Sequence, residues 1–597
     1  MNLQSIMWPE VGVCTCQELY VRLNEKAELV EPGKMLFAKH GVAWFDTYFN
    51  GVSIGKWRRY TNVQKIGLRL ELEGKFKVTL YQKRKIQNQI NEQVLKEEII
   101  IQSTRGKIEM EFPEAGKGML FFRLEGLQAQ SVFYGGEYFT NIEETKRREV
   151  KIGIVICTFK REEFIKRNVQ IIKEYLLENP TSPIQNKLKV FIVDNGKTLL
   201  EEKTENIHIF PNKNVGGSGG FTRGLMELLK ENQRGEKITH VLLMDDDVII
   251  APESIIRTWQ ILSLIKEEYR EAFIGGAMLR IDQPNIQVEA GASWNSGKLV
   301  SLKSGLDLRH VDACLYNEVE EFTEFHAWWY CCFPMKIVQK DNLPLPLFIR
   351  GDDVEYGLRN MKNLILMNGI CIWHEPFENK YSSFLNYYIV RNQLIDNSLH
   401  CPQYGKKELK KELFRRVTEE ILFYRYRNVD LILRGVEDFL KGPNWLAHTD
   451  GEALHKEIMA MGYRAEPVEQ LNMMFHYPEY DKSLQQKESK LARYLRKISF
   501  NGYLGIIRRK EKRIVSMANP QYCNVWKASQ VMYYDVAAEK GFLTQRSWKE
   551  LLLSYRKLGK VIRKINKRYE KVKKSYCLKK GKLTSLAFWK KYLRDKK

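Results

Sequence analysis

The chain has 597 residues, of which 44% are hydrophobic and 28% are charged. This length exceeds what one hydrophobic core usually serves and predicts roughly three or four units, and the composition is ordinary for a globular protein. No stretch of about 18 apolar residues occurs, and no basic segment followed by an apolar one begins the chain. The sequence therefore predicts neither a membrane-spanning helix nor a standard export signal.

The ten cysteines contain no CxxC pair, and only Cys14 with Cys16 and Cys331 with Cys332 lie close together. This spacing favours neither a disulfide framework nor a zinc site. Reduced thiols in a cytoplasm are the expectation.

The net charge of +23 is concentrated near the C-terminus, where residues 541–597 hold 20 Lys or Arg against 3 Asp or Glu. Apolar side chains alternate with these charges, which predicts a basic amphipathic helical region on an anionic membrane surface. A solvated basic tail is the alternative. Nucleic acid is a weaker partner, because no recognised RNA- or DNA-binding module accompanies the charge. We therefore expect a cytoplasmic protein, peripheral on the inner face of the cell membrane, and no bound nucleic acid.

Residues 1–149 contain short alternating or β-rich runs separated by turn residues, a pattern typical of an antiparallel β-sandwich. A charged stretch, residues 142–151, then precedes a change in pattern. Residues 150–400 alternate apolar strands with helix-like segments, which predicts a parallel α/β sheet. Residues 401–597 show helical periodicity and predict a helical C-terminal domain that ends in the basic tail. The fold class is multidomain α/β.

Three of the predicted central strands end in polar motifs, and ligands gather at the carboxyl ends of such strands. The sharpest is VLLMDDDVII, in which alternation places Asp245 and Asp247 on one side and Asp246 on the other. Neighbouring carboxylates at a strand end are costly unless a cation compensates them, and oxygen ligands suit Mg²⁺ or Mn²⁺. A solvated acidic turn is the alternative.

A glycine-rich segment, residues 214–224, leads into an apparent helix and includes Gly216, Gly217 and Gly219. Glycines allow close approach of the backbone to a ligand, and a helix N-terminus favours negative charge. The spacing matches neither the dinucleotide fingerprint nor a phosphate-binding P-loop. A flexible linker is the alternative.

Asp352 and Asp353 begin another apparent helix, whose dipole would keep a carboxylate ionised and able to act as a general base. A simple helix cap is the alternative. His374 ends a further strand and could complete a metal site with two aspartates, although a lone histidine is more often structural. Trp328 and Trp329 offer flat faces for a sugar ring, or else pack in the core.

These motifs, in the order TFKR, VDN, GGSGGF, DDD, WW, DDVEYGLR and WHE, resemble glycosyltransferase family 2 with the GT-A fold. The sequence is most similar to bacterial galactofuranosyltransferases that build galactan, and the likeness includes FDTYFN at residues 45–50 of the N-terminal β domain. The resemblance implies a nucleotide-sugar-binding, Rossmann-like central domain.

The resemblance also implies a role for each candidate residue. Asp245, Asp247 and His374 would hold the metal, and Asp353 would act as the catalytic base. The nucleotide sugar would contact Arg161, Asp194, Asp246, Gly216, Gly217 and Gly219, and the acceptor would contact Trp328, Trp329 and Asp352.

The resulting hypothesis is an inverting, Mn²⁺- or Mg²⁺-dependent transfer of galactofuranose from a UDP-sugar donor, UDP-galactofuranose, to a glycan or polyprenyl-linked glycolipid acceptor. A family 2 transferase that uses a rhamnose or glucose donor shares the core motifs and stays open. A non-catalytic glycan-binding membrane scaffold is a third hypothesis, although such a protein has no need for a metal site together with a base. The sequence leaves the oligomeric state open, a homo-oligomer included.

Overall fold

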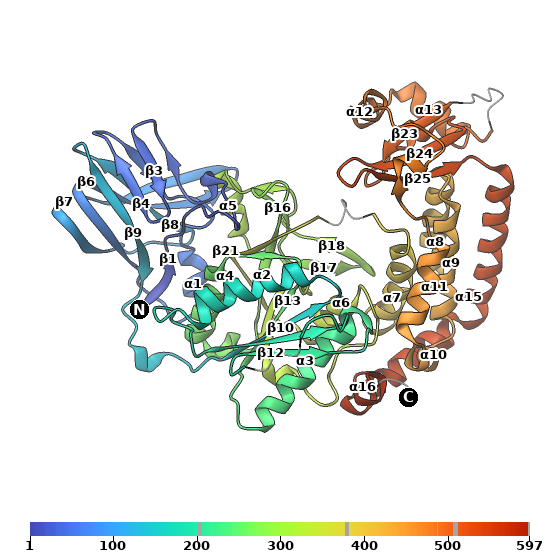
Figure 1. Cartoon of the computed structure of the whole chain (residues 1–597), viewed down its shortest axis with the longest axis horizontal. Helices are drawn as coiled ribbons and strands as arrows, with labels where there is room; N and C mark the ends of the chain where they lie inside the picture. Colours follow the sequence, from blue (N-terminus) through green and yellow to red (C-terminus); the bar gives the residue numbers. More distant parts are fainter. Residues whose placement is uncertain (201–203, 377–380, 486, 505–510, 595–597) are drawn as a thin grey trace.

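The computed structural model describes residues 1–200, 204–376, 381–485, 487–504 and 511–594. A sheet-rich N-terminal region, a central α/β region and a mainly helical C-terminal region follow one another along the longest axis (Figure 1). The predicted multidomain α/β architecture is confirmed. No helix in the described ranges is long and apolar enough to cross a membrane.

The N-terminal region is a nine-stranded sheet in which every strand pairing is antiparallel. Its centre is the 20-residue strand β6, whose first part pairs with β9 and whose second part pairs with β8. The other edge of β6 pairs along its length with β7. The strands are β1 (Asn2–Ser5), β2 (Arg22–Leu23), β3 (Ala27–Glu31), β4 (Lys34–Phe37), β5 (Val42–Trp44), β6 (Gly67–Ile86), β7 (Gln89–Glu111), β8 (Met119–Gly126) and β9 (Ser131–Phe139), with helix α1 (Ile54–Tyr60) between β5 and β6.

The central region contains a ten-stranded sheet whose first four strands, β12-β11-β10-β13, are parallel. The sheet is not parallel throughout as predicted, because β20 inserts antiparallel between β13 and β15, although β15 and β21 again pair in parallel. Strand periodicity reports burial and not direction, so the sequence pattern could not reveal this reversal. The strands are β10 (Ile152–Thr158), β11 (Leu188–Asp194), β12 (Ile207–Pro211), β13 (His240–Asp245), β14 (Ile249–Ile250), β15 (Phe273–Arg280), β16 (Ile286–Glu289), β19 (Leu306–Asp307), β20 (Tyr330–Pro334) and β21 (Leu364–His374), with β17 (Ala292–Asn295) and β18 (Lys298–Ser301) forming a separate hairpin.

The helices of the central region place the ends of these strands. Helix α3 packs on β10 and β11, whereas α4 packs on β21 and on the N-terminal strand β1. The helices are α2 (Glu162–Ile172), α3 (Gly216–Gln233), α4 (Pro252–Leu264), α5 (Val311–Asn317) and α6 (Asp352–Asn360).

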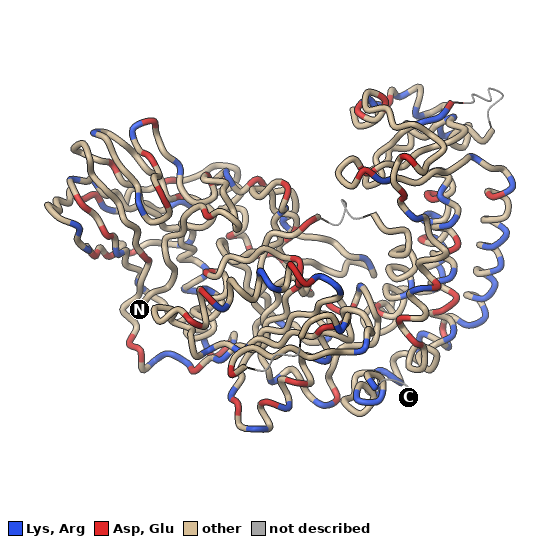
Figure 2. The backbone as a smooth tube through the Cα atoms, in the orientation of Figure 1, with Lys and Arg blue, Asp and Glu red and all other residues tan. Residues whose placement is uncertain are grey.

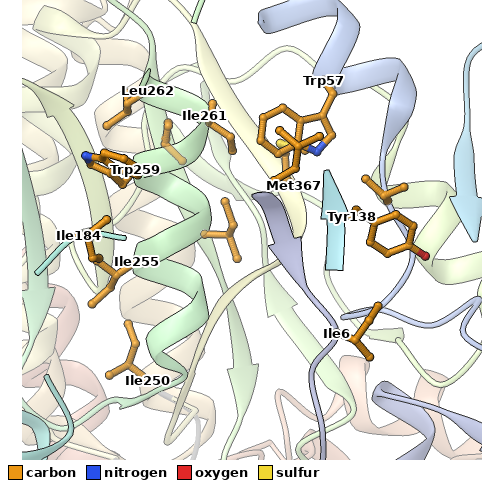
Figure 3. Close-up of a cluster of buried hydrophobic side chains, with 14 of the residues drawn as sticks. Ile6, Trp57, Tyr138, Ile184, Ile250, Ile255, Trp259, Ile261, Leu262 and Met367 are labelled. Carbon is orange, nitrogen blue, oxygen red and sulfur yellow. The ribbon is translucent and has the colours of Figure 1, made fainter. Parts of the chain in front are cut away.

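One hydrophobic core joins the N-terminal and central regions. Trp57 and Tyr138 from the first region belong to the same buried cluster as Trp259 and Met367 from the second (Figure 3). The main-chain N–H of Ser5 also donates to the carboxylate of Glu253 on α4. Because the two regions share this core, we expect them to unfold as one unit, and the boundary at 149/150 stays a prediction.

The C-terminal region is helical, as predicted, but it also contains a four-stranded sheet that the sequence analysis did not predict. The sheet strands are short and interrupted by helical segments, so their alternation is weak evidence in the sequence. The helices are α7 (Leu385–His400), α8 (Lys406–Leu422), α9 (Tyr426–Phe439), α10 (Pro443–His448), α11 (Gly451–Met461), α12 (Tyr477–Gln485), α13 (Lys490–Ile498), α14 (Tyr522–Val525), α15 (Trp548–Leu583) and α16 (Leu586–Tyr592), and the strands are β22 (Glu466–Pro467), β23 (Lys512–Ser516), β24 (Gln530–Asp535) and β25 (Lys540–Gln545).

The long helix α15 carries most of the basic tail, and its apolar stripe faces the protein. Leu558, Val561, Ile565, Tyr569 and Val572 recur at spacings of three and four residues and are buried. They pack in one core with residues of α8 and α9. Lys and Arg line the outer side of α15 (Figure 2). The expectation that this stripe lies on lipid was therefore wrong, because the protein's own core uses it.

Candidate active site

The ends of two strands bring the predicted metal ligands together. Asp245 is the last residue of β13, Asp247 follows it, and His374 is the last residue of β21. One ligand atom from each lies within 4.8 Å of the others, and Nε2 of His374 is 3.1 Å from Oδ1 of Asp247. Burial, followed by the neighbouring Asp247 carboxylate, raises the pKa of Asp245. Two carboxylates and an imidazole fit a divalent cation, which would relieve this repulsion.

Arg161 lies beside the same aspartates. It precedes α2, and its Nη1 atom is 2.9 Å from Oδ1 of Asp246 and 2.7 Å from Oδ2 of Asp247. The Arg161 side chain is 42% exposed, so it reaches solvent while it neutralises two nearly buried carboxylates. Asp246 does not belong to the ligand cluster but shares Arg161 with Asp247, and its pKa is raised, chiefly by burial. The nucleotide contacts predicted for Arg161 and Asp246 stay predictions.

Asp194 supports a loop rather than facing open space. The residue is 1% exposed, and its Oδ1 atom accepts a hydrogen bond from the main-chain N–H of Gly196. Its Oδ2 atom accepts from the N–H groups of Thr198 and Leu199 at 2.6 and 2.7 Å. These bonds fix the turn after β11, and the predicted contact of Asp194 with a nucleotide stays a prediction.

The glycines of the glycine-rich segment have different surroundings. Helix α3 begins at Gly216, whose φ of +74° suits glycine and whose missing side chain allows contact with the main chain of Phe348. A Cβ on Gly219 would overlap the side chain of Val215, so this glycine serves packing. Only Gly217 of these three has no atom within 4 Å of an added Cβ. Gly217 alone among them therefore leaves room for a ligand at the helix N-terminus.

The loop before α6 holds Asp352 and Asp353 in a strained backbone. Phe348, Arg350 and Gly351 all have positive φ, which is costly for the two residues that carry side chains. Burial raises the pKa of Asp353, whereas the sequence analysis expected the helix dipole to keep this carboxylate ionised. A base whose pKa is closer to neutrality is better matched to a hydroxyl proton.

Helix α7 clamps this loop, a function that the sequence analysis missed. Asn392 donates from Nδ2 to the carbonyl oxygens of Ile349 and Arg350 at 2.9 and 2.6 Å. Arg391 donates from Nη2 to the carbonyl oxygen of Leu347 at 2.6 Å. The only sequence signal was a run of three polar residues in an otherwise largely apolar stretch, YYIVRNQLI.

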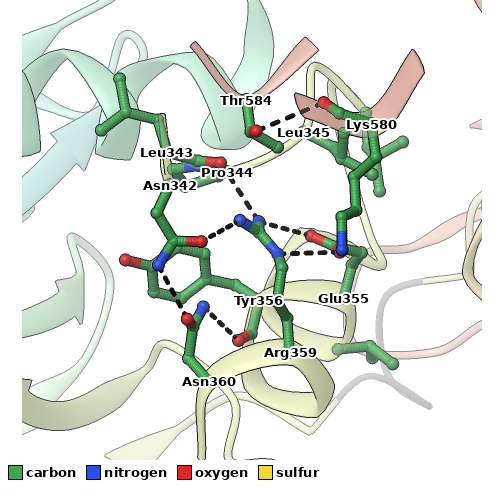
Figure 4. Close-up of polar contacts among 12 residues, drawn as sticks. Asn342, Leu343, Pro344, Leu345, Glu355, Tyr356, Arg359, Asn360, Lys580 and Thr584 are labelled. Carbon is green, nitrogen blue, oxygen red and sulfur yellow. Dashed lines mark hydrogen bonds and ion pairs between the residues drawn. The ribbon is translucent and has the colours of Figure 1, made fainter. Parts of the chain in front are cut away.

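A second set of contacts fixes the other end of α6 (Figure 4). Arg359 forms an ion pair with buried Glu355 at 2.8 Å and donates to the carbonyl oxygen of Leu343 at 3.1 Å. Asn342 donates to the side chain of Asn360 at 2.8 Å. Helix α6 is thus held at both ends, which gives the two aspartates at its start a defined position.

The candidate residues open onto a cavity of about 760 Å³, within the range of small-molecule sites. Asp245, Asp352 and Asp353 line it, and so do Trp328 and Trp329. Both tryptophans are also packed, since each is about 5% exposed or less. Packing and cavity lining therefore coexist, and contact of Trp328, Trp329 and Asp352 with an acceptor stays a prediction.

Two acidic residues of the cavity were absent from the sequence analysis. Glu289 ends β16, and burial raises its pKa to about 7. Asp396 lies on α7 and is 1% exposed. Neither belongs to a recognisable motif, because their positions depend on how the hairpin region and α7 pack against the sheet.

Two family models match parts of this chain. Residues 3–136 match the family model described as galactofuranosyltransferase 2 N-terminal, and residues 151–370 match the model described as glycosyltransferase like family 2. The central region is thus similar to glycosyltransferase family 2 domains. The predicted resemblance to this family and the predicted multidomain α/β fold class are confirmed.

Two curated relatives of this chain are named galactofuranosyltransferase GlfT2. The protein of Mycolicibacterium smegmatis is 25% identical over 434 residues, which cover 67% of this chain and 64% of the relative. That of Mycobacterium tuberculosis is 23% identical over 436 residues, covering 67% and 65%. The matched part thus spans slightly less than two thirds of each relative's length.

A solved structure, the mannosyltransferase PcManGT from Pyrobaculum calidifontis in complex with GDP-Man and Mn²⁺, is 11% identical with a TM-score of 0.27. The match covers 54% of this chain and 83% of that one. So low a TM-score supports no conclusion about the present chain.

Proposed function

We propose that this protein is an inverting glycosyltransferase that transfers galactofuranose from UDP-galactofuranose to a hydroxyl of a lipid-linked or cell-surface glycan. One observation carries the proposal: the cluster of candidate metal ligands and the carboxylate of Asp353 reach the same cavity. Asp245 lines the cavity for the cluster, and Asp353 lines it itself. A glycan-binding scaffold needs neither the cluster nor the base. The family 2 domain and the GlfT2 relatives support sugar transfer.

In the proposed reaction, Asp245, Asp247 and His374 would hold Mn²⁺ or Mg²⁺, which would supply positive charge to neutralise the diphosphate leaving group. The open N-terminus of α3 at Gly217 accepts negative charge of the donor. Arg161, which is exposed enough to reach a ligand, contributes a second positive group.

Asp353 accepts the proton of the acceptor hydroxyl while that oxygen attacks the anomeric carbon. The carbon–oxygen bond to the acceptor forms as the bond to the diphosphate breaks, so a single displacement inverts the anomeric centre. The hydrogen bonds from Asn392 and Arg391 to the preceding loop keep Asp353 in place during this step.

The choice of donor rests on the relatives and on the N-terminal domain match, since no cavity residue encodes one sugar. A rhamnose or glucose donor would use the same metal ligands and the same base. We therefore treat galactofuranose as the finer part of the proposal and test it against these donors.

We further propose that the protein binds an anionic membrane surface, where a polyprenyl-linked acceptor is found. The outer side of α15 supplies positive charge (Figure 2). The apolar contribution comes from α13, where Leu491, Tyr494, Leu495 and Ile498 are each at least 40% exposed at the spacing of one helix face. Exposed apolar residues next to basic ones are typical of a helix that lies in the membrane interface.

The deciding experiment measures UDP release and glycan product with UDP-galactofuranose, UDP-galactopyranose, UDP-glucose and dTDP-rhamnose, each with Mn²⁺ and a galactofuranosyl disaccharide acceptor. We expect product from UDP-galactofuranose alone, and its loss with chelator, with Asp353→Asn and with His374→Ala. Binding of Mn²⁺, measured by calorimetry, should be lost in His374→Ala and retained in Asp353→Asn.

Product from another donor would refute the galactofuranose assignment and preserve the mechanism. Transfer that is unaffected by both substitutions would refute the proposed site. Glycan binding without transfer from any donor would favour the scaffold.

A further inference from the structure

One face of α7 forms part of the wall of the cavity that Asp245 also lines. Ile389, Asn392, Gln393 and Asp396 line the cavity and are spaced by three, one and three residues, as expected for a single helix face. Two of the three polar side chains have protein partners. Asn392 bonds the loop before α6, and Gln393 donates to the carbonyl oxygen of Gly297 at 2.8 Å.

Asp396 differs from these neighbours. Its side chain is 1% exposed, and its Oδ1 atom is fully buried without a hydrogen-bond partner in the part of the chain that the structure describes. The carboxyl group lies against the loop before α6, since a Cβ on Gly351 would be 3.0 Å from its Oδ2 atom. Buried polar groups are almost always paired, because an unpaired one has lost its hydrogen bonds to water without a replacement. Such a group at a cavity wall indicates a ligand that completes its hydrogen bonds.

The charges around Asp396 restrict that ligand. Burial and the carboxylates of Glu355, Asp353 and Asp352 raise the pKa of Asp396 well above its usual range. These carboxylates would repel a further anion at this point, whereas they would not repel a neutral hydroxyl. A protonated carboxyl can donate one hydrogen bond and accept another. A sugar hydroxyl can accept the first and donate the second.

From these observations we propose that Asp396 binds a hydroxyl group of the acceptor sugar and thereby positions the attacking oxygen beside Asp353. The inference rests on the proposed function, because it assigns the acceptor part of the same cavity. It adds a specificity residue on α7, outside the segment matched by the family 2 model.

The test compares Asp396→Leu, which has a similar shape and no polar atoms, with Asp396→Asn, which can still donate and accept. With UDP-galactofuranose saturating and a galactofuranosyl disaccharide varied, kcat/KM for the acceptor should fall about 5- to 100-fold in Asp396→Leu. Asp396→Asn should stay within about threefold of wild type. UDP release without acceptor and the KM for the donor should be unchanged in both.

A readout independent of turnover separates binding from structural support. Removing an unpaired buried carboxyl should leave the Tm of Asp396→Leu equal to or above that of wild type, and its acceptor-induced Tm shift should disappear. Asp438→Asn is the matched control, since Asp438 is a buried carboxylate bonded to Tyr387, Arg434 and Lys441. It should lower Tm without a change in the KM for the acceptor.

The outcomes distinguish two failures. If wild type transfers sugar and Asp396→Leu has wild-type acceptor kinetics, the role of Asp396 is refuted and the proposed function stands. A lower Tm of Asp396→Leu, together with equal decreases in donor hydrolysis and sugar transfer, would also refute this role. Asp396 would then support the fold and not bind the acceptor. If wild type transfers no sugar from any donor, the proposed function itself fails.

Discussion

The Nδ2 atom of Asn392 donates a hydrogen bond to the carbonyl oxygen of Arg350, 2.6 Å away, and thereby links the C-terminal helix α7 to the loop that carries the predicted catalytic base. Arg350 has φ of +67°, a conformation that costs about 1–3 kcal/mol for a residue with a side chain. The bond from Asn392 offsets part of this strain.

Asn392→Ala should therefore let the loop relax and move Asp353 away from its position. We expect kcat to fall about 10- to 100-fold, since displacement of a catalytic group by about 1 Å has effects of this size. The KM for the donor should change by less than about twofold. Steady-state kinetics against the donor measure both constants.

Ser398→Ala is the control for Asn392, because Ser398 is buried on the same helix and its hydroxyl donates to the carbonyl oxygen of Leu394 within that helix. Its kcat should match wild type. An Asn392→Ala enzyme with wild-type kcat would show that the clamp does not govern the base.

Gly217 and Gly219 should respond in opposite ways to the same added methyl group. Gly219→Ala forces a Cβ into Val215 and should lower the free energy of unfolding by about 1–3 kcal/mol. Gly217→Ala meets no atom within 4 Å and should keep or raise stability by up to about 1 kcal/mol while it raises the KM for the UDP-sugar. Thermal melts and donor kinetics test the pair. Equal stability of both variants would contradict the packing role of Gly219.

The pKa of Glu289 predicts a pH-dependent stability difference. Burial raises this pKa from 4.5 to about 7, so the folded protein binds a proton here that the unfolded chain has lost. The resulting stabilisation is present in full below about pH 4.5 and is lost as pH rises through about 7, a change of about 2–3 kcal/mol. Glu289→Gln lacks this titration, so its Tm relative to wild type should be higher at pH 8.5 than at pH 5.

Glu114→Gln is the matched control for Glu289, because Glu114 is exposed and the substitution removes the same charge. Its Tm difference from wild type should be the same at both pH values. A constant difference for Glu289→Gln as well would show that Glu289 ionises normally.

Helix α13 should mediate membrane contact. Leu491→Glu combined with Ile498→Glu places two carboxylates on the exposed apolar face and should reduce co-flotation with phosphatidylglycerol vesicles about 10-fold or more. Neutral phosphatidylcholine vesicles should bind wild type weakly, because the basic residues of α13 and α15 then lack a partner.

Ile99→Glu combined with Ile101→Glu is the control for α13, since both residues are exposed on strand β7 at the other end of the molecule (Figure 1). This variant should float as wild type does. Equal flotation of the α13 variant would assign the contact elsewhere.

The sequence by itself determined the features that local chemistry fixes. Three adjacent aspartates after an apolar strand predicted a ligand cluster that includes Asp245 and Asp247. Burial of strands on both faces and helical periodicity after residue 400 similarly predicted the order of the regions, because each pattern reflects one element and its nearest neighbours.

Only the tertiary structure decided which patterns meet. The reversed direction of β20, the pairing of Asn392 with the loop before α6 and the burial of Asp396 all depend on contacts between segments that no local period relates. The same holds for α15, whose apolar stripe fits a membrane or a protein core equally well by sequence. In the folded protein this stripe is buried in the core, because α8 and α9 present apolar residues that pack against it. Both apolar surfaces are thereby removed from water.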